Sequence, residues 1–220
     1  MCGETHRGFE SLTLRRDMKI YKKYFLPRFL NKEMGSSDFN ESRAEVAGRA
    51  SGVVLEIGFG SGYNLPFYKN VKKLYALEPS REMYRYSEQR VQHAPFPIEH
   101  LAAGAEQIPL PDESVDSVVS TWALCSVSDI SEALAEVRRV LKQGGVFSFV
   151  EHGLSPKPVS SFIQRIVTPV SKHFTGNCHL DRDISGHVSQ AGFTFAELEK
   201  SPEAGRPLMF SYRGVAVKKP

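Results

Sequence analysis

Short apolar runs rich in β-branched residues alternate along the chain with stretches in which apolar residues recur every three or four positions. The first pattern is typical of buried strands and the second of amphipathic helices. The alternation therefore predicts a single α/β domain. Strands are predicted from Val53 to the glycine at 58, and at 73–77, 98–102, 115–121, 146–150, 194–199 and 210–217. Helices are predicted at 41–50, 64–70 and 81–91, and from an Asp129 cap to Leu141.

Three alternating glycines, Gly58, Gly60 and Gly62, follow the first predicted strand directly. Glycine allows positive φ and lets a ligand approach the backbone closely, so this stretch is a predicted ligand loop. A dinucleotide loop would need a further glycine where Tyr63 stands, and a phosphate cradle would need a Gly-Lys-Ser/Thr sequence. Glu56, just ahead of the glycines, favours a cationic ligand without phosphate.

A second acidic residue, Glu78, ends the next predicted strand and precedes Pro79. In Rossmann-like folds an acidic side chain at this place binds a ribose, because one carboxylate can accept hydrogen bonds from both hydroxyls. The alternative is a surface glutamate before a proline turn. The sequence thus predicts a nucleoside at the carboxyl ends of the first two strands.

The first fifty residues differ in character from the rest of the chain. Residues 1–11 are polar, and we expect them to be mobile. Residues 12–50 form a predicted helical cap on the domain at 51–220. Within them, 12–30 read as a basic, aromatic, amphipathic helix that Pro27 interrupts. Such a helix either covers the mouth of the site or contacts a membrane surface, and the two roles are compatible.

Composition narrows the range of partners. The formal charge is only +3 and no dense run of lysine and arginine is present, so no nucleic acid is expected as a partner. The three cysteines, at 2, 125 and 178, show no metal or redox spacing, and no metal is expected. With neither a signal peptide nor a long apolar segment, we expect a cytoplasmic protein, peripheral to a membrane if residues 12–30 bind one. The oligomeric state is left open.

Several motifs together resemble the class I S-adenosylmethionine-dependent methyltransferases. They are E-I-G-F-G-S-G at 56–62, the downstream Glu78, and R-R-V-L-K-Q-G-G at 138–145 before a strand. The resemblance covers about 53–218. It implies a Rossmann-like, mostly parallel seven-stranded sheet in the order 3-2-1-4-5-7-6, helices on both faces, and S-adenosylmethionine as cofactor.

The resemblance also implies which residues hold the cofactor. The family's G-D-A pattern places an aspartate near adenine, but this chain has Gly104 there, so Ala105 and Glu106 are the nearest candidates. Thr121 and Trp122 end the fourth strand, at the crevice of a parallel sheet. The complete predicted set is Glu56, Gly58, Gly60, Gly62, Asn64, Glu78, Pro79, Ala105, Glu106, Thr121 and Trp122.

Other segments concern the methyl acceptor. T-W-A-L-C-S-V at 121–127, F-V-E-H at 149–152 and C-H-L-D-R-D at 178–183 resemble a subgroup that includes alkyl-thiol methyltransferases and bacterial relatives. This resemblance implies a small, lipophilic acceptor, preferably a thiol, and we expect Phe25, Phe162 and Ile166 to line its pocket. His152 and His179 are the candidate bases or orienting groups, with purely structural histidines as the alternative. The alternative functions are a quinone-biosynthesis-like C-methyltransferase and a catalytically silent nucleoside-binding module.

Overall fold

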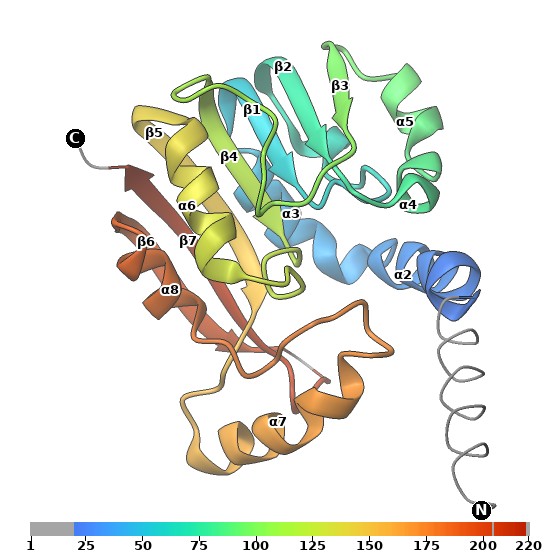
Figure 1. Ribbon diagram of the computed structural model, residues 1–220, viewed down its shortest axis with the longest axis vertical. Helices are drawn as coiled ribbons and strands as arrows, with labels where there is room; N and C mark the ends of the chain where they lie inside the picture. Colours follow the sequence, from blue (N-terminus) through green and yellow to red (C-terminus); the bar gives the residue numbers. More distant parts are fainter. Residues whose placement is uncertain (1–19, 204, 219–220) are drawn as a thin grey trace, which may run out of the picture.

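The fold is built on one sheet of seven strands in the order β3-β2-β1-β4-β5-β7-β6. The computed structural model describes residues 20–203 and 205–218 of the chain. All neighbouring strands are parallel except β7, which runs antiparallel to β5 and β6. Both the predicted strand order and the predicted antiparallel strand are therefore confirmed (Figure 1). The strands are β1 Ser51–Ile57, β2 Asn70–Leu77, β3 Ile98–Leu101, β4 Val115–Thr121, β5 Leu141–His152, β6 Phe193–Pro202 and β7 Phe210–Lys218.

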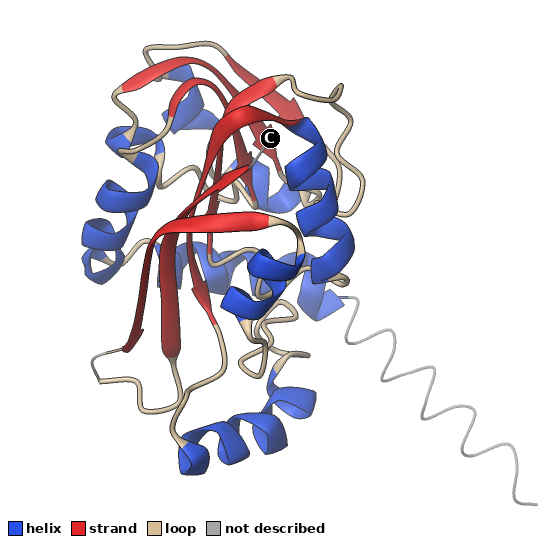
Figure 2. Ribbon diagram, turned by 90° about the vertical axis from the view of Figure 1, so that its left-hand side faces the viewer, coloured by secondary structure: helices blue, strands red, loops and turns tan. Residues whose placement is uncertain are grey.

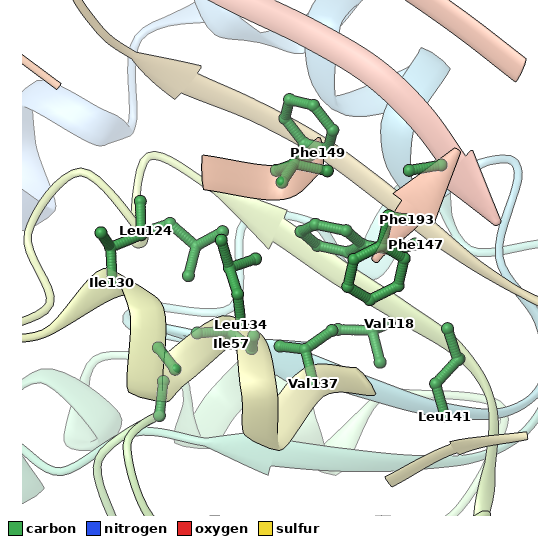
Figure 3. Close-up of a cluster of buried hydrophobic side chains, with 14 of the residues drawn as sticks. Ile57, Val118, Leu124, Ile130, Leu134, Val137, Leu141, Phe147, Phe149 and Phe193 are labelled. Carbon is green, nitrogen blue, oxygen red and sulfur yellow. The ribbon is translucent and has the colours of Figure 1, made fainter. Parts of the chain in front are cut away.

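Alternation along the central strands divides the core into two layers. Leu55 and Val118 face the cluster that includes helix α6, while Val54 and Val119 face the cluster that includes α3. Figure 3 shows the α6 side, where aliphatic side chains of the helix pack on Val118 and on a group of phenylalanines. Because both faces are covered, the central strands are continuous apolar runs, as the sequence pattern predicts.

The helices agree in place with the sequence pattern but differ in length. Two short helices, α4 and α5, take the place of the single helix predicted at 81–91. A 3₁₀ turn, Leu65–Phe67, takes the place of the helix predicted at 64–70. Ser80, Asp129 and Asp183 cap α4, α6 and α8 through their side chains. The helical segments are η1 Tyr21–Phe25, α2 Leu26–Met34, η2 Ser37–Phe39, α3 Asn40–Ala47, η3 Leu65–Phe67, α4 Arg81–Arg85, α5 Glu88–Gln92, α6 Ile130–Val140, α7 Pro158–Ser171 and α8 Ile184–Gln190.

Pro27 does not interrupt the N-terminal helix as predicted. It lies in the first turn of α2, which continues to Met34. Proline is tolerated there because the first amides of a helix have no intrahelical acceptor. The segment at 1–11, which the sequence predicts to be mobile, and residues 12–19 of the predicted cap lie outside the described residues.

Two additions stand beyond the carboxyl ends of the parallel strands. Figure 1 places α2 on one side of this edge and α7 below it, and Figure 2 shows α7 again apart from the sheet layers. In parallel sheets the ligand crevice lies at this edge. No helix among residues 20–203 and 205–218 combines the length and apolar character needed to span a membrane.

Candidate active site at the carboxyl ends of the strands

The glycine loop after β1 has the backbone that the sequence predicts. Gly58, Gly60 and Gly62 have φ values of 64°, 54° and 73°. A Cβ on Gly58 would lie 2.4 Å from the Cβ of Ala123, which leaves no room for one. A Cβ on Gly60 would lie 3.6 Å from Met83 Cε and 3.7 Å from the carbonyl oxygen of Gly58, which are ordinary contact distances, so the protein does not crowd this position. A ligand can therefore approach the chain most closely at Gly60.

Glu78 holds this loop in place. Its Oε2 accepts a hydrogen bond of 2.9 Å from the amide of Gly60, and its Oε1 accepts one of 2.9 Å from the amide of Ser80. The side chain is buried, and burial raises the pKa of the carboxyl while the two amides oppose that rise. Each carboxylate oxygen has a further lone pair. The group can therefore accept two more hydrogen bonds, as a ribose diol would require.

Glu56 is buried behind the loop in a small polar network. Its Oε1 accepts from Asn64 Nδ2 at 2.9 Å and its Oε2 from the Tyr68 hydroxyl at 2.7 Å. Asn64 also donates to Thr121 Oγ1 at 3.0 Å. Burial raises the pKa of Glu56 to about 8, against the effect of these hydrogen bonds. The predicted residues Glu56, Asn64 and Thr121 are thus brought together.

Arg43 is a buried arginine beside this network, and it was not among the predicted site residues. It comes from α3, and its Nη2 donates to the carbonyl of Met34 at 2.6 Å. Burial lowers the pKa of Arg43 to about 10, although Glu56 opposes that change. Its guanidinium carbon lies 5.4 Å from the centroids of three aromatic rings, those of Phe39, Tyr63 and Trp122. No motif marks Arg43, because only the packing of α3 brings it to the strand ends.

Trp122 has a strained backbone at the end of β4. Its φ is 54°, which is uncommon for a bulky residue and is frequent at functional sites. Its ring meets Phe39 edge to face at 4.7 Å. Trp122 Nε1 and Asn64 Oδ1 are buried and have no hydrogen-bond partner among the described residues. Unsatisfied buried polar atoms are costly, and a polar ligand at the strand ends would be able to satisfy them.

The candidates for adenine contact are less closely grouped. Glu106 Oε1 accepts from the amides of Ser128 and Asp129, at 2.7 and 3.2 Å, so this carboxylate holds the loop before α6. The side chain of Ala105 is buried in the core, and Pro79 is exposed. Only the second oxygen of Glu106 remains for other partners.

The two candidate histidines lie in different surroundings. His152 is buried, and its Nδ1 lies 3.6 Å from Cys178 Sγ. Its Nε2 lies 3.1 Å from Glu203 Oε1, but the two atoms are not aligned for a hydrogen bond. Burial lowers its pKa, but Cys125 and Glu203 raise it to about 10. His179 is partly exposed, with Nδ1 3.6 Å from Asp181 Oδ1, and burial together with Arg182 lowers its pKa. His179 is therefore the better placed of the two to accept a proton.

The N-terminal segment contacts two segments far from it in sequence, and through Phe39 it also contacts Trp122. The Tyr21 hydroxyl donates to the carbonyl of Phe174 at 2.9 Å. Arg206, from the β6–β7 connection, pairs with Glu33 at 2.6 Å, and its guanidinium lies 5.0 Å from the Phe39 ring. The N-terminal segment, the loop after α7 and the β6–β7 connection therefore form one cover for the site.

The prediction that Phe25, Phe162 and Ile166 line a pocket is wrong. These side chains are 62%, 66% and 59% exposed. Helix α7 instead buries Gln164, whose Nε2 donates to the carbonyls of Gly153 and Leu208 at 3.1 and 3.0 Å. The amide of Ser155 donates to Gln164 Oε1 at 2.8 Å. The helix is anchored by its polar residues, and its apolar side faces outward.

A cavity of about 930 Å³ lies away from these residues, at the opposite edge of the sheet. Its lining includes Glu113 before β4, Arg138 on α6 and Lys218 at the end of β7. None of the predicted site residues lines it. The strand ends and the glycine loop remain the candidate site, because the glycine loop, Glu56 and Glu78 meet there beside the unpaired Asn64 Oδ1 and Trp122 Nε1.

Known proteins share the sequence and the fold. Residues 55–149 match the family model described as a methyltransferase domain. The chain is 30% identical over 204 residues to the human protein named thiol S-methyltransferase TMT1A, an alignment that covers 86% of this chain and 84% of that protein. It is 33% identical over 153 residues to the rat thiol S-methyltransferase TMT1B, covering 68% of this chain and 63% of the relative.

A solved structure shows the same fold. The YcgJ protein of Bacillus subtilis superposes with a TM-score of 0.63 at 18% identity, over 83% of this chain and 98% of that one. At this identity the likeness concerns the fold alone. The sequence relatives, in contrast, share enough of both chains to show the family.

Proposed function

The chain belongs to the class I S-adenosylmethionine-dependent methyltransferases, and we propose that its methyl acceptor is a small, lipophilic thiol. The observation that carries the choice of acceptor is the 30% identity to a human thiol S-methyltransferase over 84% of that relative's length.

The described residues fit the cofactor. When bound, S-adenosylmethionine supplies an electrophilic methyl group on a sulfonium sulfur. We assign the ribose hydroxyls to Glu78, since both of its oxygens keep free lone pairs beside the loop. We assign the amino group of the methionine portion to Glu56 and its carboxylate to Arg43. Glu56 and Arg43 lie close together and are both buried, and the ammonium group of a bound zwitterion would favour the ionised form of Glu56.

The remaining predicted contacts are part of the same proposal. Gly58, Gly60 and Gly62 let the methionine portion lie against the backbone, and the absence of close neighbours among the described residues within 3.4 Å of a Cβ on Gly60 supports this arrangement. Asn64 and Trp122 offer the unpartnered Oδ1 and Nε1 atoms, and Thr121 holds Asn64 in place. Pro79, Ala105 and Glu106 complete the adenosine side, with Glu106 limited to its second oxygen.

A thiol acceptor requires little help with its proton. A thiol with a pKa of about 8.5 is a few per cent thiolate at pH 7, and the thiolate is the nucleophile. His179 is our candidate for accepting that proton, because it is partly exposed and its lowered pKa favours the neutral ring. We assign His152 an orienting role, because its buried ring is held between Cys178 and Glu203.

The acceptor would enter beneath the cover formed by the N-terminal segment, the loop after α7 and the β6–β7 connection. The N-terminal segment contacts the other two and, through Phe39, Trp122, and excluding water there would favour displacement at a charged sulfonium. Holding the two reactants in line can supply up to about 7–11 kcal/mol of rate enhancement in favourable cases.

We also propose that the protein binds membrane surfaces peripherally. Tyr24, Phe25 and Phe29 are more than half exposed, and Lys23, Arg28 and Lys32 lie exposed beside them. Aromatic and basic side chains on one helix are typical of interfacial binding. Flotation with anionic vesicles should recover the protein, and Phe25→Ser with Phe29→Ser should abolish that recovery. Recovery equal to that of the parent would contradict this proposal.

The acceptor is tested by measuring S-adenosylhomocysteine release across small thiols, phenols, quinols and lipid amines. We expect the highest kcat/KM with a hydrophobic alkyl thiol, and mass spectrometry should locate the methyl group on sulfur. Turnover of phenols, quinols or amines with no turnover of thiols would contradict the choice of acceptor. A shared lack of turnover together with absent cofactor binding would instead contradict the cofactor assignment.

A further inference from the structure

The fold brings together two cysteines and a histidine that come from separate parts of the chain. Cys125 follows β4, His152 ends β5 and Cys178 lies between α7 and α8. The two sulfurs are 3.6 Å apart, and Cys178 Sγ is 3.6 Å from His152 Nδ1. All three ligand atoms lie within 4.8 Å of one another.

These separations match a tetrahedral zinc site. With zinc–sulfur and zinc–nitrogen bonds of about 2.3 and 2.05 Å, tetrahedral angles place two sulfurs about 3.8 Å apart and a sulfur and a nitrogen about 3.6 Å apart. The observed distances of 3.6 Å for both pairs require only small adjustments. We therefore propose that Cys125, Cys178 and His152 bind a thiophilic divalent cation of the Zn²⁺ type.

The backbone around the cluster is already in position for such a site. The amide of His179 donates to the carbonyl of Cys125 at 2.8 Å, and Asn177 Nδ2 donates to the carbonyl of Ser126 at 2.8 Å. These two hydrogen bonds flank Cys178 on both sides and fix it opposite Cys125. Preorganised ligands lose little conformational entropy on binding.

Glu203 provides the outer contact that metal-binding histidines usually have. Its Oε1 lies 3.1 Å from His152 Nε2, on the side of the ring opposite the sulfurs. A carboxylate at this place orients the ring and fixes which nitrogen faces the metal. Ser211 in turn donates to Glu203. His152 Nε2 is buried and unpartnered in the present geometry, and a small rotation of the ring toward a bound cation would leave it close to Glu203.

Charge and burial also favour a soft cation. Cys125, Cys178 and His152 are 1%, 7% and 9% exposed, and Met209 and Leu180 pack against the sulfurs. Two thiolates and one dication sum to zero charge, which lowers the cost of burial. Binding would release the two thiol protons to solvent, and a third proton from Nδ1 of the charged His152 ring. Three protein ligands leave the fourth tetrahedral position for water or another donor.

The site would link the cover to the sheet. Cys125 and His152 stand at the ends of two central strands, whereas Cys178 belongs to the loop after α7. The ring of His152 lies 6.3 Å from that of Trp122. A bound cation would hold the loop over Trp122. This proposal does not depend on which acceptor is methylated.

The test is a titration of the reduced, chelator-treated full chain with Co²⁺ and then with Zn²⁺. We expect uptake of one Co²⁺ per chain, with a thiolate-to-cobalt charge-transfer band and tetrahedral visible bands, which Zn²⁺ then displaces. Cys125→Ser and Cys178→Ser should each roughly halve the charge-transfer intensity per bound Co²⁺ or weaken binding at least 100-fold, and the double variant should show no such band. Glu203→Gln should weaken binding about 10- to 100-fold.

Cys2→Ser is the matched control, because it removes one thiol from outside the described residues and should leave Co²⁺ binding unchanged. Circular dichroism confirms that each variant is folded, and the near-isosteric serine keeps the buried volume. Absence of stoichiometric uptake by the reduced parent would overturn the proposal. Equal affinity in the parent and in a folded Cys125→Ser, Cys178→Ser double variant would overturn it as well.

Discussion

The two ends of the crevice are built in different ways. At the β1–β2 end, Gly60 and Glu78 lie 18 residues apart and are joined by one hydrogen bond between a loop and the next strand. At the β4–β5 end, Cys125 and Cys178 lie 53 residues apart and meet only because α7 and its loop fold back over the sheet. The first end follows from local sequence, and the second depends on long-range packing. We therefore expect cofactor binding and acceptor binding to respond to different substitutions.

The largest effect is expected from Gly60→Val. A side chain here would occupy the position that we assign to the cofactor, so the affinity for S-adenosylmethionine should fall more than about 150-fold, or about 3 kcal/mol. Calorimetry measures this change. Gly144→Val is the matched control, because Gly144 has a φ of 69° and nothing within 4 Å of its added Cβ. A similar loss of affinity in both variants would indicate backbone strain instead of a blocked site.

At the other end, Gln164→Leu should destabilise the fold. The leucine would leave the carbonyls of Gly153 and Leu208 and the amide of Ser155 without their partner, at a cost of about 3 kcal/mol. Urea denaturation measures the free energy of unfolding. Ile166→Gln, on the outer side of the same helix, should change that free energy by less than about 0.5 kcal/mol. Equal effects of the two substitutions would contradict the anchoring role of Gln164.

Glu78→Ala tests the cofactor end of the crevice. It should weaken the binding free energy of S-adenosylmethionine by about 1.5–3 kcal/mol, which is the range for hydrogen bonds to a charged group. Glu99→Ala, on the neighbouring β3, removes an exposed carboxylate and should leave the affinity unchanged. Normal cofactor affinity in a folded Glu78→Ala variant would remove Glu78 from the site.

A pH effect should distinguish Glu56. Burial raises its folded-state pKa to about 8, far above its ordinary value of 4.5. Between these values the unfolded chain is ionised and the folded one keeps the proton, so the unfolded state binds fewer protons. The free energy of unfolding of the ligand-free protein should therefore fall by about 1–3 kcal/mol from pH 5 to pH 8.

Urea denaturation at both pH values measures this slope, and Glu56→Gln should reduce it, leaving the part that comes from Glu78 and Glu151, whose pKa values burial also raises. Glu99→Gln is the control, because Glu99 is exposed and its replacement should leave the slope unchanged. An identical pH dependence in the parent and in Glu56→Gln would show that Glu56 does not carry the effect.

The features of the fold and the site that could be predicted from the sequence are those that depend on local patterns. The bounds of β4, the Asp129 cap and the position of Glu78 each depend on a few neighbouring residues. The buried Arg43 and the Cys125–Cys178 contact depend on how α3 and the loop after α7 pack, which no spacing in the sequence records. Helix α7 misled the prediction because apolar residues usually face inward, whereas here Gln164 satisfies three backbone groups and turns the apolar side outward.

Two-substrate initial-rate kinetics test most directly whether the two ends serve two substrates. They should be measured on Glu78→Ala and Gln164→Leu with a hydrophobic alkyl thiol, at a temperature at which both variants are folded. If the two ends bind different substrates, Glu78→Ala should raise the KM for S-adenosylmethionine about 10- to 150-fold and change the KM for the thiol less than about twofold. Gln164→Leu should raise the KM for the thiol and spare that for the cofactor. If both variants raise the KM for the same substrate and spare the other, the division of the crevice into two ends is contradicted.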